Sequence, residues 1–276
     1  MKSTTQCYWP ATLTGPSSGW VRNTRQRVVN RVAPFAEPNP PWSVEERINR
    51  PSVDELLDRA AKRRITLVIG AAALGKTTAV ATWSCGRSAA WLRCEDPKDD
   101  ADRLLASLFA ALLAQVSTPI LSTKAPNTDE VASSAEAICG WLRNYLSEDV
   151  ILVLDDLHAL QPDSNAARAA ETLCQQAPDR LHLILLSRHE LPFSLQRVRG
   201  RGLVAEIHAP DLAFDVADME ALLRKTVGTH PPGLSRQVWD RTGGWPAAVH
   251  CASRRISMLA TARYSRVSST VAGTAG

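Results

Sequence analysis

The sequence lacks the cysteine arrangements that bind metals or staple small domains. Its six cysteines are scattered, with no C-x-x-C pair and no partnered histidines: Cys7, Cys85, Cys94, Cys139, Cys174 and Cys251. This spacing fits neither a zinc site nor a disulfide framework. It favours a reduced, cytoplasmic compartment.

Long hydrophobic runs and a strong charge of one sign are also missing. The longest apolar runs have the length of a buried strand, far short of the roughly 20 residues that span a bilayer. No apolar segment follows Lys2, as it would in a signal peptide. Lys and Arg number 32 against 28 Asp and Glu, a net charge of +4. Such a small excess does not argue for nucleic acid, and we expect no membrane association.

The chain is long enough for one sizeable core and a small second lobe. It has 276 residues, of which 45% are hydrophobic, and it contains no internal repeat. Residues 1–42 are rich in Pro, Ser, Thr and Arg and have no sustained period, so they predict a disordered tail. Small polar residues predict a second disordered tail over 261–276.

Between the two tails, apolar runs typical of buried strands alternate with helical patterns. This alternation predicts an α/β domain over residues 43–210, with a parallel five-stranded sheet and helices on both faces. Residues 211–260 have helical patterns only and predict a small all-helical lobe. The strands are expected at Ile65–Ile69, Ala89–Leu92, Val150–Leu154, Leu181–Leu186 and Leu203–Ile207. The helices are expected at Val53–Ala61, Lys76–Trp83, Leu104–Val116, Ser133–Leu146, Ala166–Gln175, Val216–Lys225, Ser235–Thr242 and Pro246–Ala260.

The strongest motif lies directly after the first predicted strand. It matches G-x-x-x-x-G-K-[ST], with a buried strand before it and a helix after it, and comprises Gly70, Ala71, Ala72, Ala73, Leu74, Gly75, Lys76, Thr77 and Thr78. Successive backbone N–H groups of such a loop surround a β-phosphate at the positive end of a helix. In this scheme Lys76 neutralises the β- and γ-phosphates and the Thr77 hydroxyl ligates Mg²⁺. The pattern arises by chance in roughly one chain of this length per hundred, and the flanking elements make coincidence rarer.

A second motif is the apolar run Val150–Leu154, which ends in Asp155 and Asp156. The carboxyl end of such a strand meets the phosphate loop at the same edge of a parallel sheet. Asp155 is expected to hold Mg²⁺, directly or through water, and Asp156 to polarise an attacking water. The alternative is that the aspartates only cap a loop, since apolar strands often end in this way.

A third signal is a cation at the same sheet edge. Arg188 follows the predicted strand Leu181–Leu186 and is placed to sense a γ-phosphate. A surface arginine that merely ends a strand is the alternative. His158 is expected to orient the paired aspartates or to cap their loop.

Together these elements resemble the nucleotide-binding domain of the STAND NTPases. The most similar type is the MalT-like, large ATP-binding regulators of the LuxR family. The resemblance covers about residues 45 to 260. It includes Arg50-Pro51 before the domain, Ala90-Trp91-Leu92 in the second strand, and Gly243-Gly244-Trp245-Pro246, which is similar to the family's G-x-P element. It implies bound ATP and Mg²⁺, with Arg50 close to the nucleotide and Pro246 packed near its base.

Two features depart from the family pattern. Residues 71–74 lack the usual Pro and aromatic, which alters the stiffness of the loop without removing its phosphate contacts. The family's sensor repeats and helix-turn-helix are not recognisable in this sequence. We therefore expect an ATP-dependent switch module that is truncated or acts alone, without a DNA-binding module of its own.

The resemblance implies ATPase activity that is weak at most, and either self-association or a regulator partner. A hydrolase or phosphotransferase of another P-loop class, with Asp156 as base, is the alternative from a different functional class. An interaction protein with a vestigial site is a third hypothesis, against which the joint presence of Lys76, Thr77 and Asp155 argues. No N-K-x-D segment is present to recognise guanine, so ATP is favoured over GTP.

Overall fold

The structure is a computed structural model and describes residues 48–94, 101–115 and 134–258. Both predicted tails lie outside these residues. So do the ends of two predicted helices at Val116 and Ser133, and the last two residues of the helix expected to end at Ala260.

Five parallel strands form one twisted sheet in the order β2-β3-β4-β1-β5. The strands are β1 (Ile65–Ile69), β2 (Ala89–Arg93), β3 (Val150–Asp155), β4 (Leu181–Ser187) and β5 (Val204–His208). Each predicted strand is present and its ends shift by at most one residue, so the predicted five-stranded parallel sheet is confirmed.

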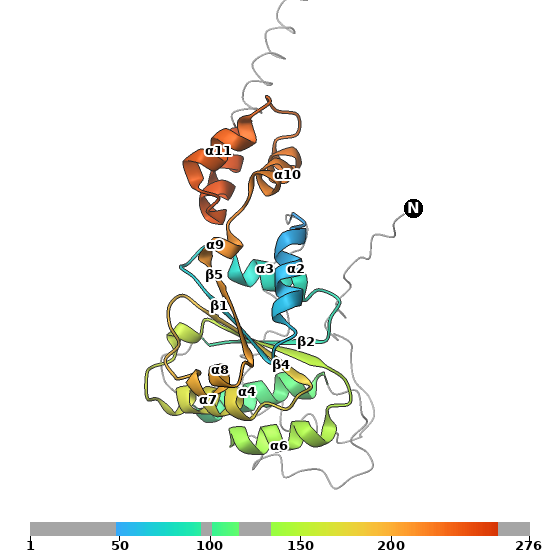
Figure 1. Cartoon of the computed structure of the whole chain (residues 1–276), viewed down its shortest axis with the longest axis vertical. Coiled ribbons are helices and arrows are strands. Elements are labelled where there is room, and N and C mark those ends of the chain that lie inside the picture. Colours follow the sequence, from blue (N-terminus) through green and yellow to red (C-terminus); the bar gives the residue numbers. More distant parts are fainter. Residues whose placement is uncertain (1–47, 95–100, 116–133, 259–276) are drawn as a thin grey trace, which may run out of the picture.

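Helices cover both faces of the sheet (Figure 1). On one face lie α2 (Pro51–Ala60) and α3 (Lys76–Trp83). On the other lie α4 (Ala101–Leu113), α6 (Ala135–Tyr145), α7 (Asn165–Gln176) and α8 (Gln196–Gly200). The short helices η2 (Leu157–Ala159), α8 and α9 (Ala209–Leu212) were not predicted, because segments of this length carry too little periodicity.

The core is split by the sheet into two clusters. Successive strand residues point to opposite faces. In β3, Leu152 and Leu154 pack toward α4, α6 and α7, whereas Val153 packs toward α2 and α3. This two-sided burial is why β3 is a continuous apolar run up to Asp155, whereas the edge strand β5 includes the exposed Glu206.

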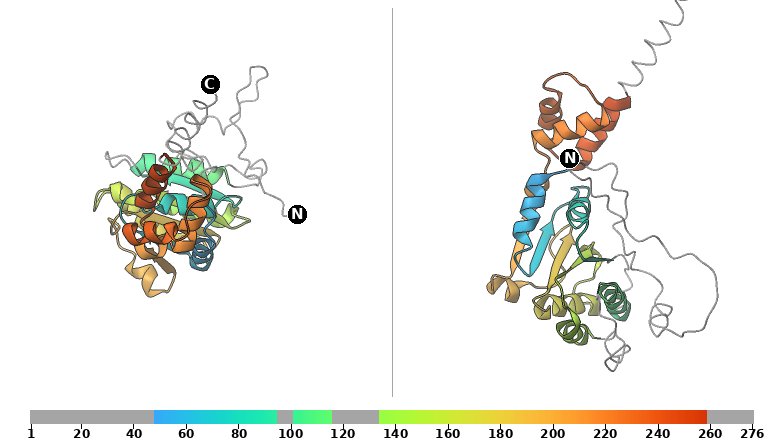
Figure 2. Two further views of the ribbon diagram at one scale, coloured as in Figure 1. Left: turned by 90° about the horizontal axis from the view of Figure 1, so that it is seen from above. Right: turned by 90° about the vertical axis from the view of Figure 1, so that its right-hand side faces the viewer.

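A group of three helices follows β5 and α9. They are α10 (Val216–Thr226), α11 (Leu234–Thr242) and a helix over residues 246–258. The group has its own small core, built from Met219, Leu222, Leu223, Val238 and Val249. We call these three helices the helical lobe; they lie beyond the carboxyl end of the sheet (Figures 1 and 2).

The start of the lobe is defined by side-chain caps. Asp215 accepts a hydrogen bond from the Asp218 N–H at 2.7 Å, and the Asp218 carboxylate accepts one from the Asp215 N–H at 3.3 Å. This reciprocal pair forms a capping box for α10, with Asp215 as its N-cap.

Cysteine behaves as predicted at most described positions. Cys94, Cys139, Cys174 and Cys251 are free thiols. The expectation of a chain without disulfides is wrong at Cys85, which is disulfide-bonded. Within the described ranges no group of three or more His, Cys, Asp or Glu side chains is arranged to hold a metal ion. Across the same ranges, no helix is both long and apolar enough to cross a membrane.

Candidate nucleotide-binding site

Residues 70–75 form the loop between β1 and α3, as the motif predicted. Its backbone turns through the left-handed region at Ala73 (φ 62°) and at Gly75 (φ 74°). Gly75 is the N-cap residue of α3, and no side chain caps this helix terminus with a hydrogen bond. The first N–H groups of a helix have no intrahelical acceptor, so this open terminus is suited to an anion.

Lys76 lies under this loop. Its ammonium donates to the Gly70 carbonyl at 2.6 Å and to the Ala71 carbonyl at 3.0 Å, and the residue is only 8% exposed. Burial lowers the pKa of Lys76 from its ordinary value, which the charges of Asp155 and Asp156 partly oppose. The loop thus surrounds a largely desolvated cation.

Thr77 and Asp155, 78 positions apart, meet at the start of α3. The Thr77 hydroxyl donates to Asp155 Oδ2 at 2.8 Å, and the other carboxylate oxygen accepts the Asp156 N–H at 2.8 Å. Asp155 is 5% exposed, and burial raises its pKa, while the Thr77 hydrogen bond opposes that shift. The two residues predicted to bind Mg²⁺ are therefore brought together, as hydroxyl and carboxylate oxygens of the kind that this ion prefers.

Asp156 has a partner that the sequence did not reveal. Its backbone is left-handed (φ 57°), and its carboxylate accepts from Arg93 Nε at 2.9 Å. Arg93 ends β2, whose register places it beside Asp155 in the neighbouring strand β3. The strand order needed to see this pair cannot be obtained from local sequence patterns.

His158 lies against this pair without bonding to it. Its Nδ1 is 3.8 Å from Asp156, too far for a hydrogen bond. This buried nitrogen has no hydrogen-bond partner among the described residues. The ring meets His189 edge-on at 5.5 Å, and burial lowers the pKa of His158.

Arg188 directly follows β4 and is exposed. Its charge contributes to lowering the pKa of both Lys76 and His158, so it acts on the loop and on the β3 edge. The carboxyl ends of β1, β3 and β4 thus bring all the predicted phosphate-side residues to one edge of the sheet.

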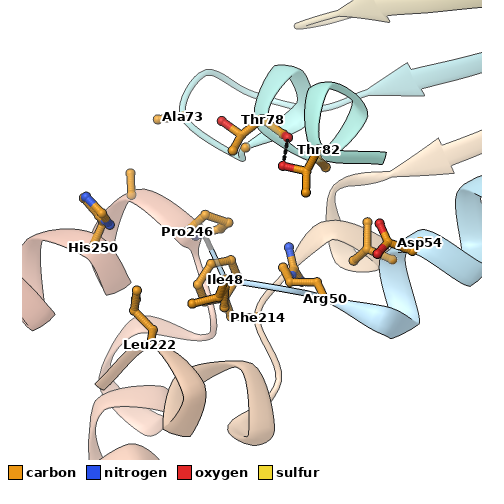
Figure 3. A pocket seen from close by; sticks show the side chains of 14 residues that line it. Ile48, Arg50, Asp54, Ala73, Thr78, Thr82, Phe214, Leu222, Pro246 and His250 are labelled. Carbon is orange, nitrogen blue, oxygen red and sulfur yellow. Dashed lines mark hydrogen bonds between the residues drawn. The ribbon is translucent and has the colours of Figure 1, made fainter. Parts of the chain in front are cut away.

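A cavity of about 380 Å³ adjoins the loop (Figure 3). Its lining comes from three parts of the chain: the segment that enters α2, the loop with α3, and the helical lobe. The lining residues are Ile48, Arg50, Val53, Asp54, Ala73, Gly75, Thr78, Ala79, Thr82, Phe214, Leu222, Pro246, Ala247 and His250. The volume is in the range of small-molecule sites.

Pro246 closes the cavity against the loop. A Cβ added at Gly75 would lie 3.7 Å from the Pro246 Cβ, which is an ordinary contact distance. Figure 3 shows Pro246 from the lobe facing Thr78 and Thr82 of α3 across the cavity. The residue that the resemblance implied for the base therefore lines the same cavity as the loop.

Arg50 lines the cavity as well, but its guanidinium is engaged by protein. All three nitrogens donate to acceptors that lie between α9 and α10 or on these helices: Leu212 O, Ala213 O and Asp218 Oδ2. That Arg50 lies close to a bound nucleotide stays a prediction, and its hydrogen bonds run to the start of the lobe. Sequence reasoning missed His250 and Phe214 as lining residues, because neither lies in a recognisable motif.

Comparisons with known proteins agree with this geometry. No protein-family model matches the chain. The transcriptional regulator MalT of Vibrio cholerae is 26% identical over 220 residues, which is 76% of this chain and 24% of that protein. MalT of Serratia proteamaculans is 28% identical over 198 residues, which is 70% of this chain and 22% of that protein. The chain thus spans about a quarter of the length of these relatives.

Among solved structures, the Walker-type ATPase PABY2304 of Pyrococcus abyssi has the same fold. The match has a TM-score of 0.51 at 13% identity, and covers 86% of this chain and 76% of that one. Sheet order, loop and these similarities lead to one conclusion: the chain has a P-loop NTPase fold, and about three quarters of it is similar in sequence to a segment of MalT.

Proposed function

We propose that this chain binds ATP with Mg²⁺ and acts as a nucleotide-dependent switch module of a MalT-like transcriptional regulator, as in the STAND NTPases. One observation carries the proposal. One ligand-sized cavity is lined by Gly75 of the loop, by Phe214 just before the helical lobe, and by Pro246 of the lobe. A ligand that fills it touches both parts of the chain.

The phosphate half of the site has one role for each residue. The N–H groups of the loop and the start of α3 receive the phosphates, and Lys76 neutralises them. Thr77 and Asp155 would hold Mg²⁺, which would neutralise part of the negative charge of the phosphates. Thr78 lies one position further along α3 and lines the cavity, where the nucleoside begins.

The base half is mainly apolar, formed by Val53, Phe214, Leu222 and Pro246. An aromatic base gains hydrophobic and dispersion energy in such a cavity. Because Pro246 and Phe214 belong to the lobe side, ATP favours the arrangement in which the lobe rests on the loop. A ligand shifts such an equilibrium only through its different affinity for the two arrangements.

Hydrolysis is proposed to be slow. Asp156, the candidate base, has its carboxylate paired with Arg93 at 2.9 Å. One of its two carboxylate oxygens is therefore already occupied by a protein donor and is not free to accept a proton from water. Arg188 is proposed to sense the γ-phosphate. Release of this phosphate after hydrolysis would then weaken the closed arrangement.

The remaining context is part of the same proposal. A regulator module of this kind works in the cytoplasm and communicates with a further regulator segment, a partner protein or a second copy of itself. The division into a nucleotide-binding domain over 43–210 and a lobe over 211–260 stays a prediction. The lining of the cavity includes residues from both.

Hydrogen exchange of residues 216–258 tests the proposal. With Mg·ATP we expect slower exchange in this segment than without nucleotide, and with ADP a different, smaller protection. Arg188→Ala should remove the difference between ATP and ADP while leaving ADP binding intact. Identical exchange with ATP, with ADP and without nucleotide would show that the lobe does not respond, and the switch would be refuted.

A further inference from the structure

Arg50 lies just before α2, yet its side chain is bonded to the start of the helical lobe. Its Nε donates to Asp218 Oδ2 at 2.9 Å, its Nη1 to the Leu212 carbonyl at 3.0 Å, and its Nη2 to the Ala213 carbonyl at 2.7 Å. The side chains of Arg50 and Asp218 are only 12% and 7% exposed. A charged pair this deeply buried is stabilising only while both partners are present.

The same guanidinium also contacts Phe214, which is hydrogen-bonded to the turn that carries Pro246. Its central carbon lies 4.4 Å from the centre of the Phe214 ring. The Phe214 N–H donates to the Gly244 carbonyl at 2.8 Å, and the Phe214 carbonyl accepts from Trp239 Nε1 at 2.9 Å. The chain of contacts therefore runs from Arg50 through Phe214 to Gly244, two residues before Pro246.

We propose that Arg50 and Asp218 form a clasp that positions the helical lobe, and so keeps Pro246 at the nucleotide cavity. Arg50 is a positioning residue in this scheme and not a direct ligand of the nucleotide. The effect on ATP rests on the proposed function, whereas the clasp itself has a consequence for the protein without nucleotide.

The lobe is proposed to have two arrangements, one closed against the loop and one open. When either partner is removed, the other is left unpaired in the closed arrangement, so the open arrangement gains population. A ligand that needs both the loop and the lobe then binds more weakly, in proportion to the closed fraction. A ligand that contacts the loop alone keeps its affinity. Inorganic tripolyphosphate is such a ligand, because it has no base or ribose.

The test uses the full chain with Arg50→Gln, Asp218→Asn and the double variant. We expect faster exchange of residues 216–258 without nucleotide in each single variant. ATP affinity should fall about tenfold, equivalent to about 1.4 kcal/mol, and tripolyphosphate affinity should not change. The double variant should be little worse than either single one, because they break the same contact. Arg50→Lys keeps the charge but not the forked geometry, and should give an intermediate result.

Asp215→Asn is the matched control. Asp215 is the N-cap of the same helix and has no bond to Arg50, and asparagine is an equally good N-cap. This variant should exchange and bind as the unaltered chain does. It separates loss of the clasp from a general weakening of α10.

Asp218 decides between the clasp and direct binding, because it does not line the cavity. If Arg50→Gln weakens ATP while Asp218→Asn changes neither ATP affinity nor exchange, Arg50 is a nucleotide ligand and the clasp is refuted. Unchanged exchange in both variants also overturns it. If the unaltered chain binds neither ATP nor tripolyphosphate, the proposed function fails, and the exchange measurement still tests the clasp.

Discussion

Lys76 is a buried cation whose hydrogen-bond acceptors are neutral carbonyl oxygens of Gly70 and Ala71. A phosphate at the loop would supply the negative charge that this ammonium lacks. Lys76→Ala should therefore lower ATP affinity at least about a hundredfold, roughly 2.7 kcal/mol. Calorimetry measures the loss, and the exposed Lys62→Ala serves as a control of equal charge change. Retained affinity in Lys76→Ala would contradict the phosphate assignment.

Asp155 is held in a position that costs stability. Burial raises its pKa above the ordinary value, so the folded chain binds this proton more tightly than the unfolded chain. Its contribution to stability is present below the ordinary pKa and is lost as pH rises through the raised one. Without nucleotide, Asp155→Asn should therefore raise the melting temperature by a few degrees at neutral pH. The gain should vanish in acid, where the native carboxyl is protonated.

The same substitution should be harmful to metal binding. Asp155→Asn should weaken ATP binding in Mg²⁺ more than in a chelator, because only the metal-bound complex uses this carboxylate. Titrations with and without Mg²⁺ give the comparison. Equal losses under both conditions would place Asp155 outside the metal site.

At the scale of elements, the turn between α11 and the helix over 246–258 holds the lobe in shape. Two adjacent glycines in it have left-handed backbone, Gly243 with φ 58° and Gly244 with φ 72°. A Cβ at Gly244 would lie 2.2 Å from the Phe214 carbonyl oxygen, whereas one at Gly243 would have open space. An alanine at either position would have a strained backbone, but only an alanine at Gly244 would also clash with Phe214.

Gly244→Ala should destabilise the lobe far more than Gly243→Ala. Gly243→Ala should lower the free energy of unfolding by about 1 kcal/mol, which is the strain of a left-handed alanine. Gly244→Ala adds a collision with the Phe214 carbonyl, which cannot move without breaking its hydrogen bond to Trp239. We expect this variant to lower the free energy of unfolding by more than about 3 kcal/mol. Denaturant unfolding and ATP affinity measure both. Equal effects of the two variants would show that the turn yields to the clash.

At the scale of the whole molecule, the two parts differ in the size of their cores. The sheet has a large cluster on each face, whereas the lobe has five buried apolar residues. Without nucleotide, residues 216–258 should therefore open at lower denaturant concentration than the strands. Mg·ATP should bring the two openings together, because it stabilises only the arrangement with both parts in place. Exchange at increasing urea measures both. A single transition without nucleotide would contradict the prediction.

The sequence alone determined the parts of this protein that depend on neighbours along the chain. Burial on both faces made β1 and β3 continuous apolar runs, and the phosphate loop needs a fixed spacing of Gly70, Gly75 and Lys76. The bounds of α3 were predicted to the residue, because loop and helix form one local unit. The meeting of Thr77 with Asp155 also followed, since the carboxyl ends of parallel strands share an edge.

Only the tertiary structure decided what depends on strand order and on the placement of the lobe. The pair of Arg93 with Asp156 requires β2 to lie beside β3, and local patterns do not encode that order. The Arg50–Asp218 pair joins residues 168 positions apart. The sequence could mark Arg50 as close to the nucleotide. It could not show that the hydrogen bonds of Arg50 run to the start of the lobe. The physical reason is that such contacts depend on the packing of the whole chain, while periodicity and motifs record only what a segment needs by itself.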